Sequence, residues 1–246
     1  VGDMIWASAD MMTRGFLLGG TAGRTTLNGE GLQHQDGHSP ILASTVPSVR
    51  TYDPAFAWEL AILVCFGIQR MFVEDHDELF YLMMYNEALP MPARPAHEAL
   101  DEGVVRGGYL LEPAAGDGPR VNLLGSGTIL FEVMQAAETL REEGYSVAVY
   151  SITSYIELAR DAERAEQADA DPAWLDTIFP ETDVPIVAAT DYVRALPRMI
   201  ASWINGPFMA LGTDGFGMSE RRSDLRAHFK VDAASIADVA RKLTAR

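Results

Sequence analysis

The sequence predicts an α/β fold in which helices cover mostly parallel β-sheets, and two observations carry this prediction. From residue 119 onward, short apolar segments alternate with helical segments, which is typical of a three-layer domain with a mostly parallel sheet. The first 90 residues have the order strand, helix, strand, which indicates another α/β unit. A proline-rich polar stretch separates the two units. We therefore expect a domain over residues 1–90, a linker over 91–118 and a domain over 119–246.

The first unit is expected to begin with a helix that ends at Gly15, followed by a glycine-rich loop. Residues 41–52, "ILASTVPSVRTY", are β-branched and apolar and predict a strand that Pro47 terminates. Asp53 followed by Pro54 predicts the start of a buried apolar helix that runs to about residue 73. The apolar run "ELFYLMMYNE" over 78–87 predicts a strand that is buried on both faces.

The linker offers one possible short strand, "GVVRGGYLL" over residues 103–111. In the second unit, the predicted strands cover residues 120–127, 145–152, 184–191 and 208–217. The predicted helices cover residues 128–144, 154–167, 191–203 and 231–246.

Charge and composition narrow the possible partners and the compartment. The chain has 19 basic and 35 acidic side chains, and this net charge of −16 repels phosphate backbones, so we expect no nucleic-acid partner. No apolar run reaches the roughly 18 residues of a membrane span, and the sequence does not open like a secretory signal. Cys65 is the only cysteine and is expected to be an inert core thiol. A cytoplasmic location fits these features.

Two glycine turns have both a functional and a structural interpretation. "GSGT" at residues 125–128 follows a strand and opens a helix, so it could bind a phosphate, but a tight turn is favoured because no full phosphate-binding motif is present. "GTDGFG" at 212–217 could bind a metal or an anion, and again a turn at a strand end is favoured. His76 and His97 are expected at the surface, and His228 at a helix end.

The loop "GGTAGRTTLNGEGLQHQDGHS" over residues 19–39 is the main candidate for chemistry. Glu30, His34 and His38 are spaced four apart, so a helical turn would place them on one face. The intervening "QDG" disfavours such a turn and the metal site that it could form. A histidine near a carboxylate is suited to donating a proton to a substrate oxygen. The residues alone leave open a functional site and a hydrogen-bonded structural loop.

This loop closely resembles a characteristic segment of the homodimeric bacterial pyruvate dehydrogenases, the thiamine-diphosphate-dependent first component of the pyruvate dehydrogenase complex. The resemblance continues through "YDPAFAWELA", "YNEALPMPARP", "LLGSGTIL", "TSYIELARD" and "LGTDGFGMSERR", in the same order. It implies the second half of a pyrimidine-type thiamine-diphosphate-binding α/β domain, followed by a transketolase-type C-terminal domain. The family's diphosphate- and magnesium-binding motif and its cofactor-activating glutamate have no match here.

The resemblance implies decarboxylation of pyruvate and acetylation of a lipoyl group on the acetyltransferase component. It implies thiamine diphosphate and magnesium as cofactors of the complete enzyme, bound mostly by parts absent from this chain. His34 matches the active-site histidine that hydrogen-bonds the substrate-derived adduct, Glu30 matches a carboxylate that orients the loop or meets the partner subunit, and His38 is a further catalytic candidate. The expected partners are the rest of the enzyme, a second subunit and the lipoyl domain. The alternatives are a non-catalytic dimerisation or scaffold piece and a related thiamine enzyme acting on another 2-oxoacid.

Overall fold

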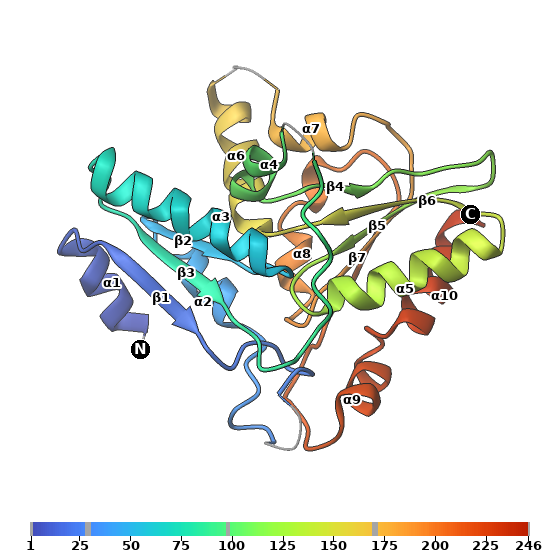
Figure 1. Ribbon diagram of the computed structural model, residues 1–246, viewed down its shortest axis with the longest axis horizontal. Helices are drawn as coiled ribbons and strands as arrows, with labels where there is room; N and C mark the ends of the chain where they lie inside the picture. Colours follow the sequence, from blue (N-terminus) through green and yellow to red (C-terminus); the bar gives the residue numbers. More distant parts are fainter. Residues whose placement is uncertain (1, 28–30, 97–98, 169–171, 246) are drawn as a thin grey trace.

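The computed structural model describes residues 2–27, 31–96, 99–168 and 172–245. It contains a three-stranded sheet and a five-stranded sheet, which lie side by side (Figure 1). We call the described residues of 2–96 the first lobe and those of 107–245 the second lobe. The predicted α/β fold is therefore confirmed.

The sheet of the first lobe is entirely parallel, with the order β1 (Gly15–Gly19), β3 (Leu79–Met83), β2 (Val49–Tyr52). One face packs on α3 (Ala57–Ile68), where Phe80 and Leu63 join one apolar cluster. The other face packs on α1 (Gly2–Asp10) and α2 (Ser39–Ser44). This alternation follows from the two-residue period of a strand.

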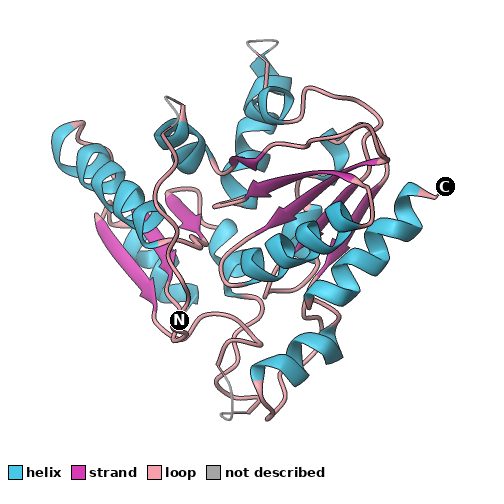
Figure 2. Ribbon diagram, turned by 45° about the vertical axis from the view of Figure 1, so that its right-hand side comes forward, coloured by secondary structure: helices cyan, strands magenta, loops and turns pink. Residues whose placement is uncertain are grey.

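The sheet of the second lobe has the order β4–β6–β5–β7–β8, in which only β4 is antiparallel. Its strands are β4 (Tyr109–Glu112), β5 (Arg120–Gly125), β6 (Ser146–Ser151), β7 (Ile186–Ala189) and β8 (Phe208–Leu211). On one face lie α5 (Ile129–Glu142) and α10 (Ala233–Thr244). On the other lie α6 (Tyr155–Ala168), α7 (Trp174–Ile178) and α8 (Ala195–Arg198), which gives the predicted three layers (Figure 2).

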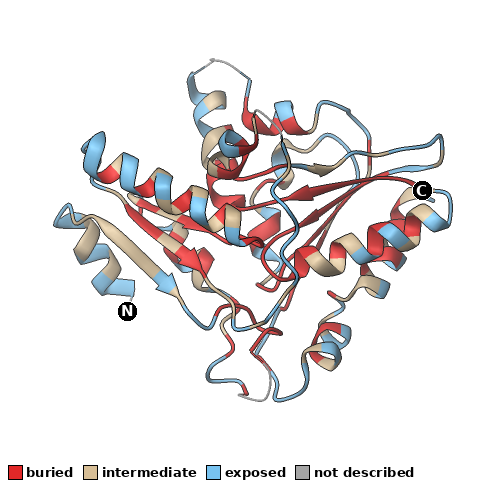
Figure 3. Ribbon diagram, viewed as in Figure 1, coloured by how far each residue is buried: buried red, intermediate tan, exposed pale blue. Residues whose placement is uncertain are grey.

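Burial explains why the central strands of the second lobe read as continuous apolar runs. Every residue of β6 is buried, and so are five of the six in β5 and all four in β7 (Figure 3). A strand covered by helices on both faces has no solvent-facing side and therefore loses the alternation of polar and apolar residues. The predicted strands at 120–127, 145–152, 184–191 and 208–217 are confirmed in their core residues.

In the first lobe, the strand predicted over residues 41–52 was wrong in its first half, and one strand was not predicted. Residues 39–44 form α2 rather than a strand, because Pro40 occupies a first-turn helical position and Ala43 is buried against the sheet. Only residues 49–52 form the strand β2. The short strand β1 was missed, because three apolar residues between two glycines look like part of a loop.

The helix predicted from Asp53 begins four residues later. Its start is set by Glu59, whose carboxylate accepts hydrogen bonds from the backbone N–H of Ala55 at 2.6 Å and of Phe56 at 3.0 Å. Asp53 is thereby left outside the helix. The predicted end near Val73 is confirmed, because α3 continues directly into the π-helical segment Gln69–Val73.

The remaining differences concern helices and Cys65. The predicted helix 191–203 is reduced to α8 and the 3-10 helix Ala201–Trp203. Pro197 lies in the first turn of α8, and its ring prevents the helix from extending further toward residue 191. The segment 91–118 contains α4 (Leu100–Arg106) and β4, and α9 (Arg222–Phe229) precedes α10. Cys65 is exposed on α3, not buried in the core. No described helix is both long and apolar enough to cross a membrane.

Candidate functional site

The loop between β1 and α2, of which residues 20–27 and 31–38 are described, lies where the carboxyl ends of both sheets meet (Figure 1). We call it the β1–α2 loop. The N–H of Ala22 donates to the carbonyl of Met84, just after β3, and the N–H of Arg24 donates to the carbonyl of Asp191, just after β7. In open α/β sheets, ligands bind outside the carboxyl ends of the strands. The loop therefore occupies the position where a site is expected.

Asp191 anchors the first half of this loop. It is fully buried, and its carboxylate accepts hydrogen bonds from the backbone N–H and hydroxyl of Thr25, at 2.9 and 2.7 Å, and from those of Thr26, at 3.2 and 2.7 Å. Burial raises the pKa of Asp191, although the hydrogen bonds from Thr25 and Thr26 act in the opposite direction. The Thr26 hydroxyl also meets that of Thr128 at 2.8 Å, next to the start of α5.

Arg24 and Gly37 hold the two arms of the loop together. The Arg24 guanidinium donates to the carbonyl of Thr213 and lies against Gly37, where a Cβ atom would collide with it. The Gly37 carbonyl in turn accepts from the N–H of Val193 at 2.7 Å. Gly37 is therefore required for close approach, and both arms contact segments that follow β7 and β8.

Gln35 ties the second half of the loop to the segment after β8. Its side chain is buried, donates to the carbonyl of Leu27 at 2.9 Å and accepts from the N–H of Met218 at 2.7 Å. Asp36 accepts from the N–H groups of His38 and Ser39, both at 3.0 Å, and so satisfies free donors at the start of α2. The loop is thus fixed at several points.

Two arginines of α9 close the site from the side. Arg222 donates to the carbonyls of Thr26 and Asn86, each at 2.7 Å. Arg226 is buried and pairs with Glu87 at 2.6 Å and with Glu132 at 3.2 Å. These contacts connect the β1–α2 loop to both lobes.

The structure describes two of the three predicted site residues, His34 and His38. His34 and His38 are both exposed, on either side of the buried Gln35. Residues 32–34 form a turn, with the N–H of His34 donating to the carbonyl of Gly31, and α2 begins only at Ser39. The imidazoles therefore do not share a helical face. Glu30 lies outside the described residues.

The two glycine turns are filled by the chain itself. At "GSGT", a Cβ on Gly127 would collide with the Tyr85 hydroxyl and Asp53, so the turn is occupied by side chains of the first lobe. At "GTDGFG", Asp214 accepts from the N–H and the guanidinium of Arg194, at 2.8 and 2.6 Å. Partial burial acts to raise the pKa of Asp214, but the hydrogen bonds and charge of Arg194 outweigh it, so the pKa is lowered. The structural interpretation is supported in both cases.

Asp53 is an interlobe residue that sequence reasoning assigned to a helix cap. Its N–H donates to the carbonyl of Thr153 at 2.7 Å, its carbonyl accepts from the N–H of Gly127 at 3.1 Å, and its carboxylate accepts from the hydroxyl of Tyr85. Burial raises the pKa of Asp53 to about 7.

Asp191, Gln35 and Arg24 were also missed as anchors. For Asp191 a signal existed, since it is the last residue of the strand predicted over 184–191 and so had to lie at the carboxyl edge of the sheet.

Fold and site together define a transketolase-like α/β protein, and comparisons with known proteins agree. Residues 107–232 match the family model described as the transketolase-like C-terminal domain. A transketolase structure from Leishmania mexicana superposes with a TM-score of 0.69 at 18% identity, covering 93% of this chain and 30% of that one. At that identity the likeness concerns the fold.

Sequence relatives narrow this class further. Residues 1–92 match the model of the pyruvate dehydrogenase E1 component middle domain. The pyruvate dehydrogenase E1 component of Corynebacterium glutamicum is 47% identical, with 96% of this chain and 26% of that protein covered. That of Escherichia coli K12 is 43% identical, with 96% and 27% covered. The chain belongs to the pyruvate dehydrogenase E1 component family and spans about a quarter of the length of these relatives.

Proposed function

We propose that this chain forms one wall of the active site of a thiamine-diphosphate-dependent pyruvate dehydrogenase. The observation that supports this most directly is the β1–α2 loop, which is anchored at the carboxyl edges of both sheets and exposes His34 between fixed points. Because the curated relatives are about four times longer, the activity requires residues beyond this sequence. A longer polypeptide or a companion chain would supply them.

The described residues do not fit the diphosphate and magnesium part of the cofactor. Among residues 2–27, 31–96, 99–168 and 172–245, no group of three or more His, Cys, Asp or Glu side chains could hold a metal ion. The "GSGT" turn, a possible phosphate site by its sequence, is filled by Tyr85 and Asp53. We therefore propose that the cofactor binds mainly to residues outside this sequence.

The role proposed for His34 is to hydrogen-bond an oxygen of the pyruvate-derived adduct. An imidazole has one ring nitrogen that can donate a hydrogen bond and one that can accept it, so it can pair with such an oxygen. Fixing the flanking Gln35 and Asp36 restricts where the imidazole can lie, which is what a positioned acid–base group needs. We propose that Glu30 orients this loop or meets a second subunit, and that His38 is a further catalytic residue.

The same proposal extends to the partners. The acyl group would pass to a lipoyl group of the acetyltransferase component, and the complete enzyme would act as a homodimer. The site lies at a loop-rich edge of both sheets, where a lipoyl chain could approach from solvent.

A chimeric enzyme tests the role of His34. In it, this sequence replaces the matching quarter of the Corynebacterium glutamicum E1 component, and pyruvate decarboxylation is followed with an artificial electron acceptor. We expect His34→Gln to lower turnover by about 100-fold or more, which is the lower range for losing an acid–base group. His76→Gln, at another exposed histidine, is the matched control and should leave turnover unchanged. An equal rate in the two variants would remove His34 from the site.

The isolated chain tests where the cofactor binds. We expect no saturable binding when thiamine diphosphate and magnesium are titrated into the 246-residue chain, while the chimera binds both. Saturable binding by the isolated chain would contradict the proposal that the cofactor is held elsewhere.

A further inference from the structure

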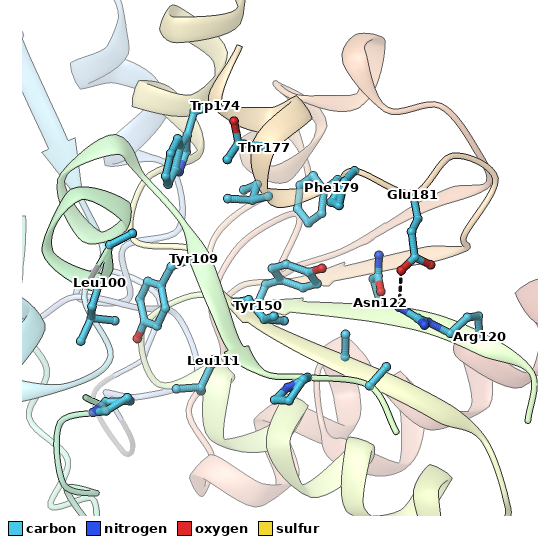
Figure 4. A pocket seen from close by; sticks show the side chains of 18 of the residues that line it. Leu100, Tyr109, Leu111, Arg120, Asn122, Tyr150, Trp174, Thr177, Phe179 and Glu181 are labelled. Carbon is cyan, nitrogen blue, oxygen red and sulfur yellow. Dashed lines mark hydrogen bonds and ion pairs between the residues drawn. The ribbon is translucent and has the colours of Figure 1, made fainter. Parts of the chain in front are cut away.

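A cavity of about 630 Å³ lies between β4, α7 and one face of β5 and β6 (Figure 4). Its volume is in the range of sites that hold a small organic molecule. Leu110 in its wall is 47% exposed, so the cavity opens to solvent. None of its described lining residues belongs to the β1–α2 loop, so a ligand bound in it would be independent of the active site proposed above.

The walls of this cavity are mostly apolar and aromatic. Trp174 and Phe179 line it from α7 and the residue that follows α7, and Leu111 lines it from β4. The rings of Tyr150 and Phe179 pack edge to face, with 4.8 Å between their centroids. Walls of this kind favour a ligand with a large apolar or aromatic part.

Tyr150 brings an unpaired polar atom into this apolar wall. It lies in β6, and only 6% of its surface is exposed. Among the described residues its hydroxyl has no hydrogen-bond partner, yet, unlike the unpaired hydroxyls of Tyr155 and Tyr192, it is not sealed from solvent. Figure 4 shows it pointing along the cavity toward Arg120 and Glu181. Since the hydroxyl of a buried tyrosine usually has a partner, a ligand in the cavity is a reason for this one.

Arg120 and Glu181 place a positive and a negative group at the same end of the cavity. The Nη2 atom of Arg120 and the Oε1 atom of Glu181 are 2.8 Å apart, and the two side chains are 41% and 52% exposed. Among the described residues, this contact leaves the second carboxylate oxygen of Glu181 and the other guanidinium nitrogens of Arg120 available. Burial is the main reason why the pKa of Tyr150 is raised. Glu181 raises this pKa further and Arg120 opposes it, so both charges lie near the hydroxyl.

A hydroxyl, a guanidinium and a carboxylate together match the two charged groups of a free amino acid. The ligand carboxylate would accept hydrogen bonds from the Tyr150 hydroxyl and from Arg120, and the ligand ammonium would donate to Glu181. Because the charges of Arg120 and Glu181 compensate each other, the cavity favours a ligand without net charge over an anion or a cation. We propose that the cavity binds an α-amino acid with a large apolar side chain, which lies along the aromatic wall while the charged groups lie at Tyr150, Arg120 and Glu181.

L-Phenylalanine titrated into the 246-residue chain tests this proposal by calorimetry or ligand-observed NMR. We expect saturable binding, and binding weaker by about tenfold or more for three analogues that each lack one recognised group. These are phenethylamine, which lacks the carboxylate, 3-phenylpropionate, which lacks the ammonium, and L-alanine, which lacks the aromatic ring. No saturable binding at millimolar L-phenylalanine, or equal affinity for L-phenylalanine and any of the analogues, would overturn the proposal.

Two substitutions assign the charged groups of the ligand to their partners. Tyr150→Phe removes only the hydroxyl, and we expect it to weaken the binding of both L-phenylalanine and 3-phenylpropionate by about tenfold, since both carry the carboxylate. Glu181→Gln should weaken L-phenylalanine by a similar factor of about ten but should not weaken 3-phenylpropionate, which has no ammonium. Tyr145→Phe, at a tyrosine outside the cavity, is the matched control and should bind L-phenylalanine as the unchanged chain does.

An equal loss for both ligands in Glu181→Gln, or unchanged binding of L-phenylalanine in Tyr150→Phe, would contradict the proposed contacts. If Tyr150→Phe does not fold, the analogues on the unchanged chain and the exposed Glu181→Gln still decide.

Discussion

The two lobes are built from the same elements, yet the first leaves more of its large apolar side chains exposed than the second. In the second lobe, helices cover both faces of the sheet, and the central strands are buried throughout. In the first lobe, α1 has no buried residue, and large apolar side chains remain exposed on it and on β1, among them Met4 at 76% and Leu18 at 58%.

This difference teaches that the first lobe depends on its surroundings. Three strands are close to the minimum for an independent sheet, and contiguous exposed apolar residues mark surfaces that other polypeptide covers. In the described part of the chain, its main support is the second lobe, through Glu59, Asp53 and the β1–α2 loop.

The largest effect is expected from a pair of leucine variants that compares the lobes directly. Leu130 on α5 is fully buried, so Leu130→Ala should lower the free energy of unfolding by about 3 kcal/mol. Leu18 on β1 is 58% exposed, and Leu18→Ala should change it by less than about 0.5 kcal/mol. Chemical denaturation of both variants measures the difference. Similar losses would contradict the comparison, and a larger loss for Leu18→Ala in the chimera would show that other polypeptide covers β1.

A smaller loss in the free energy of unfolding is expected when Glu59, which joins the lobes, is replaced. Besides capping α3, its carboxylate accepts from the hydroxyls of Tyr109 at 2.7 Å and Ser151 at 2.6 Å, both in the second lobe. Glu59→Gln places an N–H donor against these hydroxyl donors. We therefore expect the free energy of unfolding to fall by about 2 kcal/mol. The exposed Glu138→Gln is the matched control. Hydrogen exchange should quicken in β1, β2 and β3 more than in β5. The opposite order would argue against the dependence of the first lobe on the second.

The contact at Asp53 should make the junction of the lobes sensitive to pH. Burial raises the pKa of Asp53 from 3.8 to about 7, so the folded state binds this proton more tightly than the unfolded chain does. The stabilisation that this bound proton contributes is therefore fully present below about pH 4 and is lost as pH rises through about 7. We expect the unchanged chain to lose roughly 2–3 kcal/mol more than Asp53→Asn between pH 5 and 8. Parallel pH profiles of the two proteins would show that Asp53 does not titrate there.

The smallest change in stability is expected in the β1–α2 loop. Gln35→Ala removes the hydrogen bonds to Leu27 and Met218, and we expect the free energy of unfolding to fall by about 1 kcal/mol or less. In the chimera, however, pyruvate turnover should fall because the segment that carries His34 is no longer held. Gln33→Ala, at an exposed neighbour, is the control. Unchanged turnover in Gln35→Ala would show that this anchor does not position the loop.

Much of the second lobe could be predicted because its signals are local. The runs at β5, β6 and β7 are apolar over their whole length, and Gly144, with a φ of 90°, ends the segment after α5 where only glycine fits easily. The first lobe was harder. In α2, propensity favoured a strand, but Pro40 and the burial of Ala43 favour a helix. For the exposed Cys65, the apolar sequence of α3 concealed which of its faces meets the sheet.

Local patterns were enough to predict the α/β class, the succession of the main strands and the segment that resembles a catalytic loop, since periodicity and motifs are properties of neighbouring residues. Only the tertiary structure decided that Asp191 holds Thr25 and Thr26 from 166 and 165 positions away, and that Asp53 joins the lobes instead of capping a helix. The tertiary structure likewise decided that the Tyr150 hydroxyl opens into a cavity. Such contacts depend on how the sheets bring distant strand ends together, and no local pattern in the chain encodes that geometry.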